Sequence, residues 1–154
     1  MIWEKLDESR IYLGLKAENT KEIFEKMGRR LIEAGFVKEN YVEGLIEREE
    51  EFSTGLRTPI GVAIPHTSAD YVNKTTFSVA VLNKPVQFVE MGTDDDKVDV
   101  EVVIMLTIAE AHGHIDMLQR VIAIIQDAEL VKNIKNSKDE KTVIELIKQK
   151  EETL

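Results

Sequence analysis

The pattern of apolar and polar positions divides the chain into helices near its two ends and strands between them. The longest apolar run covers residues 99–109 and lacks polar alternation, which predicts a central strand buried on both faces. Shorter apolar or alternating runs predict four more strands, at residues 11–15, 60–64, 76–82 and 86–89, with a turn at residues 83–85. Residues 1–9 carry scattered apolar positions and predict no firm element.

Apolar residues at helical spacing predict helices on either side of these strands, namely between Asn19 and Gly35, at residues 39–51, from residues 111–114 through Ile125, at residues 127–134, and behind Ser137. Asn19 with Glu22, and Ser137 with Glu140, form capping boxes. The order of the predicted elements, in which helices come first, then strands, then helices, predicts an α/β fold. Its core would be a single mixed β-sheet flanked by helices on both sides. The length of 154 residues predicts one domain over residues 1–154.

Composition and charge narrow the class of protein. The chain has no cysteine, which excludes disulfides, cysteine nucleophiles and thiolate metal sites and suits a cytoplasmic protein. A net charge of −9 argues against a nucleic-acid-binding surface. The first residues lack the pattern of a signal peptide, and no apolar run approaches the length of a membrane span. We therefore expect a cytoplasmic protein with no nucleic-acid partner and no direct membrane insertion.

His66 follows the predicted strand at residues 60–64 after a single proline. Pro65 ends a strand because it has no N–H to donate. Strand ends in α/β folds are where ligands bind, and an imidazole acts as a base or a nucleophile at neutral pH. The alternative is a histidine with a purely structural role, partly buried and hydrogen-bonded, in a chain that serves as a binding module.

Two kinds of site are compatible with the three histidines, each of which follows a predicted strand. His66, His112 and His114 together suit a Zn²⁺ or Cu²⁺ site in a metal-dependent enzyme. A helix N-terminus near His114 also suits an anion, and Arg48 can add a bidentate guanidinium, which would make His66 the acceptor of a phosphoryl group. No nucleotide-binding motif is present, so phosphorylation of a histidine implies a protein donor.

The segment Gly-Val-Ala-Ile-Pro-His-Thr at residues 61–67 resembles the signature of the fructose/mannitol-type enzyme IIA domains of the bacterial phosphoenolpyruvate-dependent sugar phosphotransferase system. Arg48 and Glu49 match the Arg-Glu pair of that family, and residues 114–118 match its His-Leu-x-x-Leu helix start. Residues 88–96 look most like the galactitol-type branch. One departure is Thr67, because the usual residue after the active histidine is glycine.

This resemblance implies a phosphohistidine carrier with the family's mixed sheet flanked by helices. His66, through the Nε2 atom that the family suggests, would accept a phosphoryl group from HPr and pass it to a cysteine of a cognate enzyme IIB. That enzyme IIB would serve a membrane enzyme IIC for sugar uptake, with galactitol as the favoured sugar. His114 would stabilise the transferring group and Arg48 would contact its oxygens, with no metal, nucleotide or other cofactor. His112 has no fixed equivalent, and enzyme IIB and enzyme IIC would be separate chains.

The chemistry adds two expectations and leaves one alternative open. His66 must be neutral to attack, so we expect an acceptor to hold its other ring nitrogen. A partner must approach closely, so we expect apolar surface around His66. The alternative is a regulatory enzyme IIA paralogue, whose phosphorylation state would control partner proteins instead of feeding sugar transport.

Overall fold

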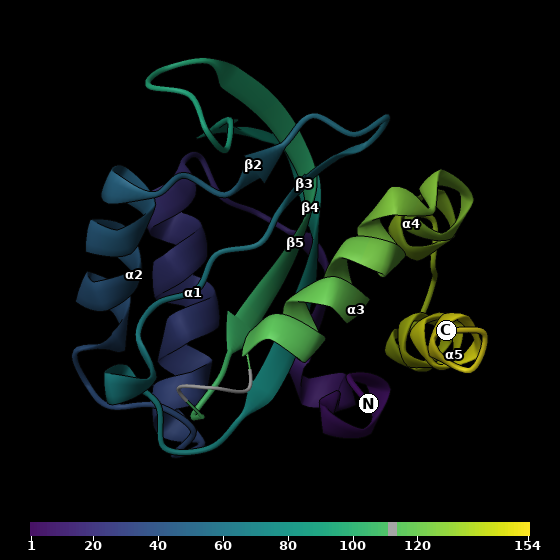
Figure 1. Cartoon of the computed structure of the whole chain (residues 1–154), viewed down its shortest axis with the longest axis horizontal. Coiled ribbons are helices and arrows are strands. Elements are labelled where there is room, and N and C mark those ends of the chain that lie inside the picture. The colour runs from purple at the N-terminus through teal and green to yellow at the C-terminus, as the bar shows by residue number, and fades with distance from the viewer. Residues whose placement is uncertain (111–113) are drawn as a thin grey trace.

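The computed structural model describes residues 1–110 and 114–154 (Figure 1). The described residues form one mixed sheet with the strand order β1-β4-β5-β3-β2. The strands are β1 (Ile11–Leu15), β2 (Gly55–Leu56), β3 (Gly61–Ala63), β4 (Thr76–Val89) and β5 (Lys97–Thr107). β1 runs parallel to β4, and β3 runs parallel to β5, whereas the pairs β4–β5 and β2–β3 are antiparallel. The predicted fold class is confirmed.

The helices cover both faces of this sheet (Figure 1). They are α1 (Thr20–Glu33), α2 (Tyr41–Glu51), α3 (His114–Gln126), α4 (Ala128–Lys135) and α5 (Glu140–Glu151), with short 3₁₀ turns η1 (Trp3–Lys5), η2 (Glu8–Arg10) and η3 (Ala69–Tyr71). α1 and α2 pack on one face, and α3, α4 and α5 pack on the other (Figure 1). Among the described residues, no helix combines the length and the apolar character needed to cross a membrane.

β5 is the central strand that its apolar run predicts. Its successive side chains point to opposite faces of the sheet. Ile104 and Leu106 enter the core beneath α3, α4 and α5, whereas Val103 and Met105 enter the core beneath α1 and α2. All four side chains are buried, so β5 belongs to both cores at once.

β4 corrects the prediction of two strands joined by a turn. Residues 76–89 form one continuous strand, and its register against β5 shifts between Val81 and Val86. The residues expected to turn, 83–85, are exposed and lie within this irregularity. A proline is tolerated there because the disrupted ladder does not require its N–H. The turn-forming residues therefore mark a bulge, and the strand continues through them.

Helix ends agree with the sequence pattern at α1 and differ from it at α5. Asn19 caps α1 by accepting a hydrogen bond from the Glu22 N–H, as predicted. The predicted cap at Ser137 is wrong, because the carboxylate of Asp139 accepts from the N–H and the hydroxyl of Thr142. The Ser137 hydroxyl instead donates to the Asn133 carbonyl at 2.8 Å, which closes the end of α4. Ser137 and Asp139 are both residue types that cap helices, and Asp139 is the cap because it directly precedes the first turn of α5.

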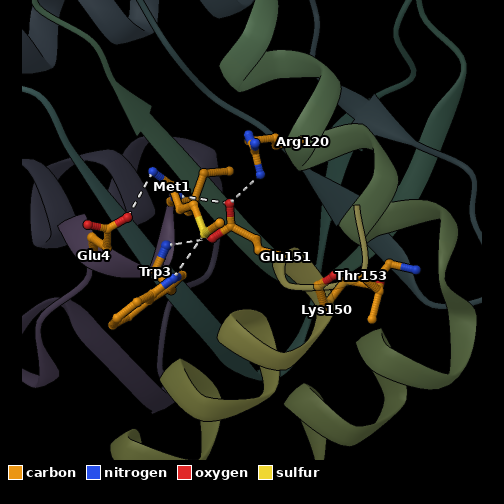
Figure 2. Close-up of polar contacts among 8 residues, drawn as sticks. Met1, Trp3, Glu4, Arg120, Lys150, Glu151 and Thr153 are labelled. Carbon is orange, nitrogen blue, oxygen red and sulfur yellow. Dashed lines mark hydrogen bonds and ion pairs between the residues drawn. The ribbon is translucent and has the colours of Figure 1, made fainter.

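The N-terminal segment also departs from prediction, because residues 1–9 include η1 and the start of η2. Glu151, at the end of α5, fixes this segment (Figure 2). Its carboxylate is fully buried and accepts from the backbone N–H groups of Ile2 at 2.9 Å and Trp3 at 2.7 Å. Arg120 of α3 donates to the same carboxylate at 3.3 Å. One buried carboxylate thus joins the N-terminus, α3 and α5.

We predict that Glu151→Ala lowers the free energy of unfolding by about 3 kcal/mol, because two buried backbone donors and a guanidinium lose their acceptor. Chemical denaturation followed by circular dichroism measures this loss. Glu152→Ala is the matched control, since Glu152 is the next residue and is exposed. Equal stability of the two variants would contradict the role given to Glu151.

Candidate functional site

His66 lies at the end of the sheet, beside the C-terminal end of the central strand β5. β3 ends at Ala63, but the chain continues along β5, and His66 forms an isolated parallel bridge with Leu106. The Leu106 N–H donates to the Pro65 carbonyl at 3.0 Å, which fixes this extension. The His66 side chain is partly buried. The histidine at a strand end that the sequence predicts is therefore held rigidly by the neighbouring strand.

The ring of His66 has a defined hydrogen-bond partner. Its Nδ1 atom lies 2.8 Å from the carbonyl oxygen of Ile64. A carbonyl oxygen only accepts, so Nδ1 carries the hydrogen and, in the neutral ring, the lone pair lies on Nε2. The expectation that an acceptor holds one ring nitrogen is confirmed. The sequence alone did not identify that acceptor, because the acceptor is a backbone carbonyl.

Thr67, the residue that departs from the family pattern, points to the other face of the sheet. Alternation along an extended chain places neighbouring side chains on opposite faces. The buried hydroxyl of Thr67 donates to the Gly44 carbonyl in α2 at 3.1 Å. α2 approaches closely here, since a Cβ added at Gly44 would lie 2.9 Å from the ring of Tyr71. Thr67 therefore fastens the histidine segment to α2.

Glu49 forms a second link between α2 and the histidine segment. Its carboxylate accepts from the Thr54 N–H at 2.8 Å and from the Thr54 hydroxyl at 2.7 Å. The Thr54 carbonyl in turn accepts from the Ile64 N–H at 3.3 Å. Burial raises the pKa of Glu49, and the two hydrogen bonds from Thr54 act in the opposite direction. A chain of contacts thus runs from Glu49 through Thr54 to the residue whose carbonyl holds His66.

Arg48 lies one helical turn beyond Gly44 on α2 and has an exposed side chain. Its guanidinium carbon lies 4.3 Å from the ring centroid of Phe52, in a cation–π contact. Phe52 is itself 52% exposed, so this pair stands at the surface. The contact between Arg48 and a phosphoryl group at His66 stays a prediction.

α3 begins at His114, close to the end of β5 (Figure 1). The predicted helix start is therefore confirmed, but His112 and the side chain of His114 lie outside the described part of the chain. α3 carries an apolar stripe beside its exposed polar residues Asp116 and Gln119: Ile115 is 69% exposed, Ile122 is 42% exposed and Leu118 is partly buried between them. This spacing of three and four residues places them on one side of the helix. An apolar surface therefore begins at the same end of the sheet as His66.

Within residues 1–110 and the described side chains beyond them, no three histidine or carboxylate groups are placed to hold a metal ion. The metal site proposed from the sequence needs His112 and His114 as well as His66. Two of its three side chains are outside the described part, so that alternative is not tested by the geometry.

Comparisons with known proteins agree with the geometry. The model of the family "Phosphoenolpyruvate-dependent sugar phosphotransferase system, EIIA 2" matches residues 4–150. The mannitol-specific EIICBA component of Pasteurella multocida (strain Pm70) is 30% identical over 146 residues, which are 93% of this chain and 22% of that protein. The ascorbate-specific EIIA component of Escherichia coli (strain K12) is 27% identical over 138 residues, which are 89% of this chain and 88% of that protein.

The crystal structure of the mannitol IIA of Escherichia coli has the same fold, with a TM-score of 0.75 and 25% identity over 93% of this chain and 99% of that one. The chain spans about a fifth of the length of the mannitol-specific relative and most of the length of the ascorbate-specific one. Since the family model covers almost every residue, including the strand end that carries His66, this chain belongs to the EIIA 2 family of the phosphoenolpyruvate-dependent sugar phosphotransferase system.

Proposed function

We propose that this chain is a phosphohistidine carrier, in which His66 accepts a phosphoryl group from HPr and passes it to a cysteine of a cognate enzyme IIB. The observation that carries this proposal is the hydrogen bond from Nδ1 of His66 to the Ile64 carbonyl. It places the lone pair of the neutral ring on Nε2, and a neutral imidazole nitrogen is the nucleophile that phosphoryl transfer requires.

The first transfer forms a bond between Nε2 of His66 and phosphorus while the bond between phosphorus and the donor histidine nitrogen breaks. Positive charge develops on the ring of His66 as its lone pair is shared. The Ile64 carbonyl stabilises that charge and fixes the direction of the ring. In the second transfer a cysteine thiolate of enzyme IIB forms the new bond to phosphorus, and the Nε2 lone pair returns to His66. Both steps depend mainly on positioning and on charge.

Arg48 and His114 are proposed to stabilise the transferring group. Three non-bridging phosphoryl oxygens carry the negative charge, and a guanidinium can contact two of them at once. Arg48 projects from α2 one turn beyond the carbonyl that binds Thr67. His114 is the first residue of α3, whose N-terminus adds a partial positive charge. The assignment of both roles follows from the match to the family motif.

The proposed partners follow from the names of the relatives and from the surface. The mannitol-specific relative is an EIICBA component, a name that joins the C and B components with the A component. We propose that this chain acts with an enzyme IIB and, through it, with a membrane enzyme IIC. The apolar stripe on α3, formed by Ile115, Leu118 and Ile122, supplies a docking surface beside His66.

For the sugar, galactitol is the first candidate because residues 88–96 resemble the galactitol-type branch. Mannitol and ascorbate, which appear in the names of the relatives, are the other sugars to test. The competing role is that of a regulatory paralogue, which would be phosphorylated on His66 and would not phosphorylate an enzyme IIB.

We predict that incubation with phosphoenolpyruvate, enzyme I and HPr adds one acid-labile phosphoryl group to the wild-type chain and none to His66→Ala. Intact mass before and after mild acid measures it. His112→Ala is the matched control and is expected to be phosphorylated normally. Failure of the wild-type chain to gain mass with an active HPr would contradict the carrier function.

Addition of a cognate enzyme IIB then separates transport from regulation, because only a transport component transfers the phosphoryl group onward.

Removal of either proposed stabilising group is predicted to slow transfer without preventing it. Arg48→Gln and His114→Ala should each reduce the single-turnover rate by roughly 10²–10³, the effect of losing one donor aimed at developing charge. Rapid-quench measurement of phosphoryl loss from HPr gives this rate. Arg57→Gln is the control, because Arg57 is an exposed arginine whose partner is Glu90. An unchanged rate in Arg48→Gln would show that its proposed role is wrong.

Glu49 is proposed to position His66 through Thr54. Its carboxylate accepts both donors of Thr54, and the Thr54 carbonyl holds the Ile64 N–H. Because burial raises the pKa of Glu49, folding favours its protonated form. The stabilisation that this proton supplies is present at low pH and is lost as the pH rises through the raised pKa.

We therefore predict that the stability of the wild type falls relative to Glu49→Gln as the pH rises from 4 to 7. Each tenfold difference in proton affinity between the folded and unfolded states corresponds to about 1.4 kcal/mol. Urea denaturation of both proteins across this range measures the trend. Glu50→Gln, a change at an exposed neighbour, controls for the loss of one charge. A stability difference that moves in the opposite direction would contradict the pKa assigned to Glu49.

A further inference from the structure

A groove at the opposite edge of the sheet from β2 has no part in the proposed phosphoryl transfer. It lies between β1 and α1, has a volume of about 450 Å³, and is lined by Tyr12, Leu15, Glu25, Lys26, Arg29, Arg30 and Glu33. Tyr12 is paired with Ala80, Ala80 with Val103, and Val103 with Ala63. Three strand spacings of about 4.8 Å therefore separate Tyr12 from β3, which is roughly 14 Å.

The hydroxyl of Tyr12 is the unusual feature of this groove. Tyr12 is 8% exposed, and its hydroxyl oxygen is buried without a hydrogen-bond partner among the described residues. Tyr41 provides an internal comparison, because it is also buried but its hydroxyl lies 3.0 Å from the Thr107 hydroxyl. Buried hydroxyl groups in proteins are normally paired, so the Tyr12 hydroxyl lacks a partner that its surroundings should supply.

Two arginines flank Tyr12. The guanidinium carbon of Arg30 lies 5.0 Å from the centre of the Tyr12 ring. Arg10, two residues before Tyr12, also has a buried Nε atom without a hydrogen-bond partner among the described residues. Burial raises the pKa of Tyr12, and the charges of Arg30 and Arg10 act in the opposite direction, which places both cations within electrostatic reach of the hydroxyl. Arg10 itself lies outside the groove lining, with its guanidinium carbon 4.5 Å from the ring centroid of Phe36, so Arg30 is the arginine that both contacts Tyr12 and lines the groove.

The charge around Tyr12 is not balanced by the protein. None of the ion pairs found among the described residues includes Arg10, Arg29 or Arg30. Three cations, Lys26, Arg29 and Arg30, line the groove with only two carboxylates, Glu25 and Glu33, so its lining carries a net positive charge. This positive lining stands out in a chain whose net charge is −9.

We propose that Tyr12 and Arg30 bind an oxyanion, the phosphate or carboxylate group of a small molecule, in this groove. Arginine side chains only donate hydrogen bonds, and a tyrosine hydroxyl donates one, so the missing partner is an acceptor. An oxyanion supplies several acceptor atoms and the opposite charge. The ring of Tyr12 and the side chain of Leu15 provide apolar wall for the rest of the molecule. This proposal does not depend on the chemistry of His66.

Titration of the ¹⁵N-labelled full chain with inorganic phosphate, and separately with acetate, tests the site at constant ionic strength. We expect amide shifts that saturate at residues 10–15 and 26–33. Tyr12→Phe and Arg30→Gln should each weaken the affinity about tenfold, since each removes a hydrogen bond to a charged group. Lys21→Gln is the matched control, because it removes an exposed cation of α1 that does not line the groove. His66→Ala should leave these shifts unchanged.

A thermal denaturation series separates binding from folding. Tyr12→Phe loses no hydrogen bond within the described protein, so its melting temperature in anion-free buffer should be no lower than that of the wild type. Phosphate or acetate should then raise the melting temperature of the wild type more than that of Tyr12→Phe. Saturation by phosphate alone would assign a phosphoryl ligand, and saturation by acetate alone a carboxylate.

Shifts that do not saturate, or that respond equally in Tyr12→Phe, Arg30→Gln and Lys21→Gln, would overturn the site. Shifts confined to residues 64–68 would also overturn it, because they would place the anion at His66. That second result would leave the phosphocarrier function untouched, so the two proposals fail separately.

Discussion

Gly61 approaches the backbone of β5 more closely than any other residue type could. A Cβ at this position would collide with the carbonyl oxygen of Asp99. This contact lets β3 lie against the central strand, and the pairing continues past the end of β3 to His66 and Leu106. β5 itself is packed on both faces, because its residues belong to both cores. The position of His66 therefore depends on a glycine five residues earlier in the chain.

The same segment is held from both sides by hydrogen bonds that use backbone carbonyls. The Ile64 carbonyl accepts from the His66 ring, and the Gly44 carbonyl accepts from the Thr67 hydroxyl. Thr54 connects Ile64 to the partly buried carboxylate of Glu49. The proposed carrier function requires one nitrogen to meet two different partners in turn, and a rigid strand end would keep that nitrogen in one place for both. The Thr67 side chain adds a hydrogen bond to α2, which a glycine at this position could not make.

The sheet separates two regions with different chemistry. His66 pairs with Leu106, whose side chain enters the core beneath α3, α4 and α5. Tyr12 faces the other core, beneath α1 and α2, at the far edge strand. Arg30 lies over the ring of Tyr12, whereas α3 exposes the apolar side chains of Ile115 and Ile122. One face therefore suits a protein partner, and the opposite edge suits a small anion.

The sequence by itself determined the local elements of this protein. The apolar run that forms β5, the cap at Asn19 and the strand-proline-histidine order at His66 are short-range patterns, and local backbone preferences are enough to fix them. A short motif around His66 also indicated the family that the comparisons show. Where two local patterns competed, the sequence was ambiguous, as at Ser137 and Asp139.

Only the tertiary structure decided which distant residues meet. Glu151 binds the N–H groups of Ile2 and Trp3 across almost the whole chain, and Thr67 binds Gly44 in a different element. β4 continues through its predicted turn because pairing with β5 on both sides of the irregularity outweighs the local turn preference of residues 83–85. The Tyr12 groove, too, exists only once β1 and α1 are packed. Contacts of this kind arise from packing and backbone pairing, which no local pattern of residues encodes.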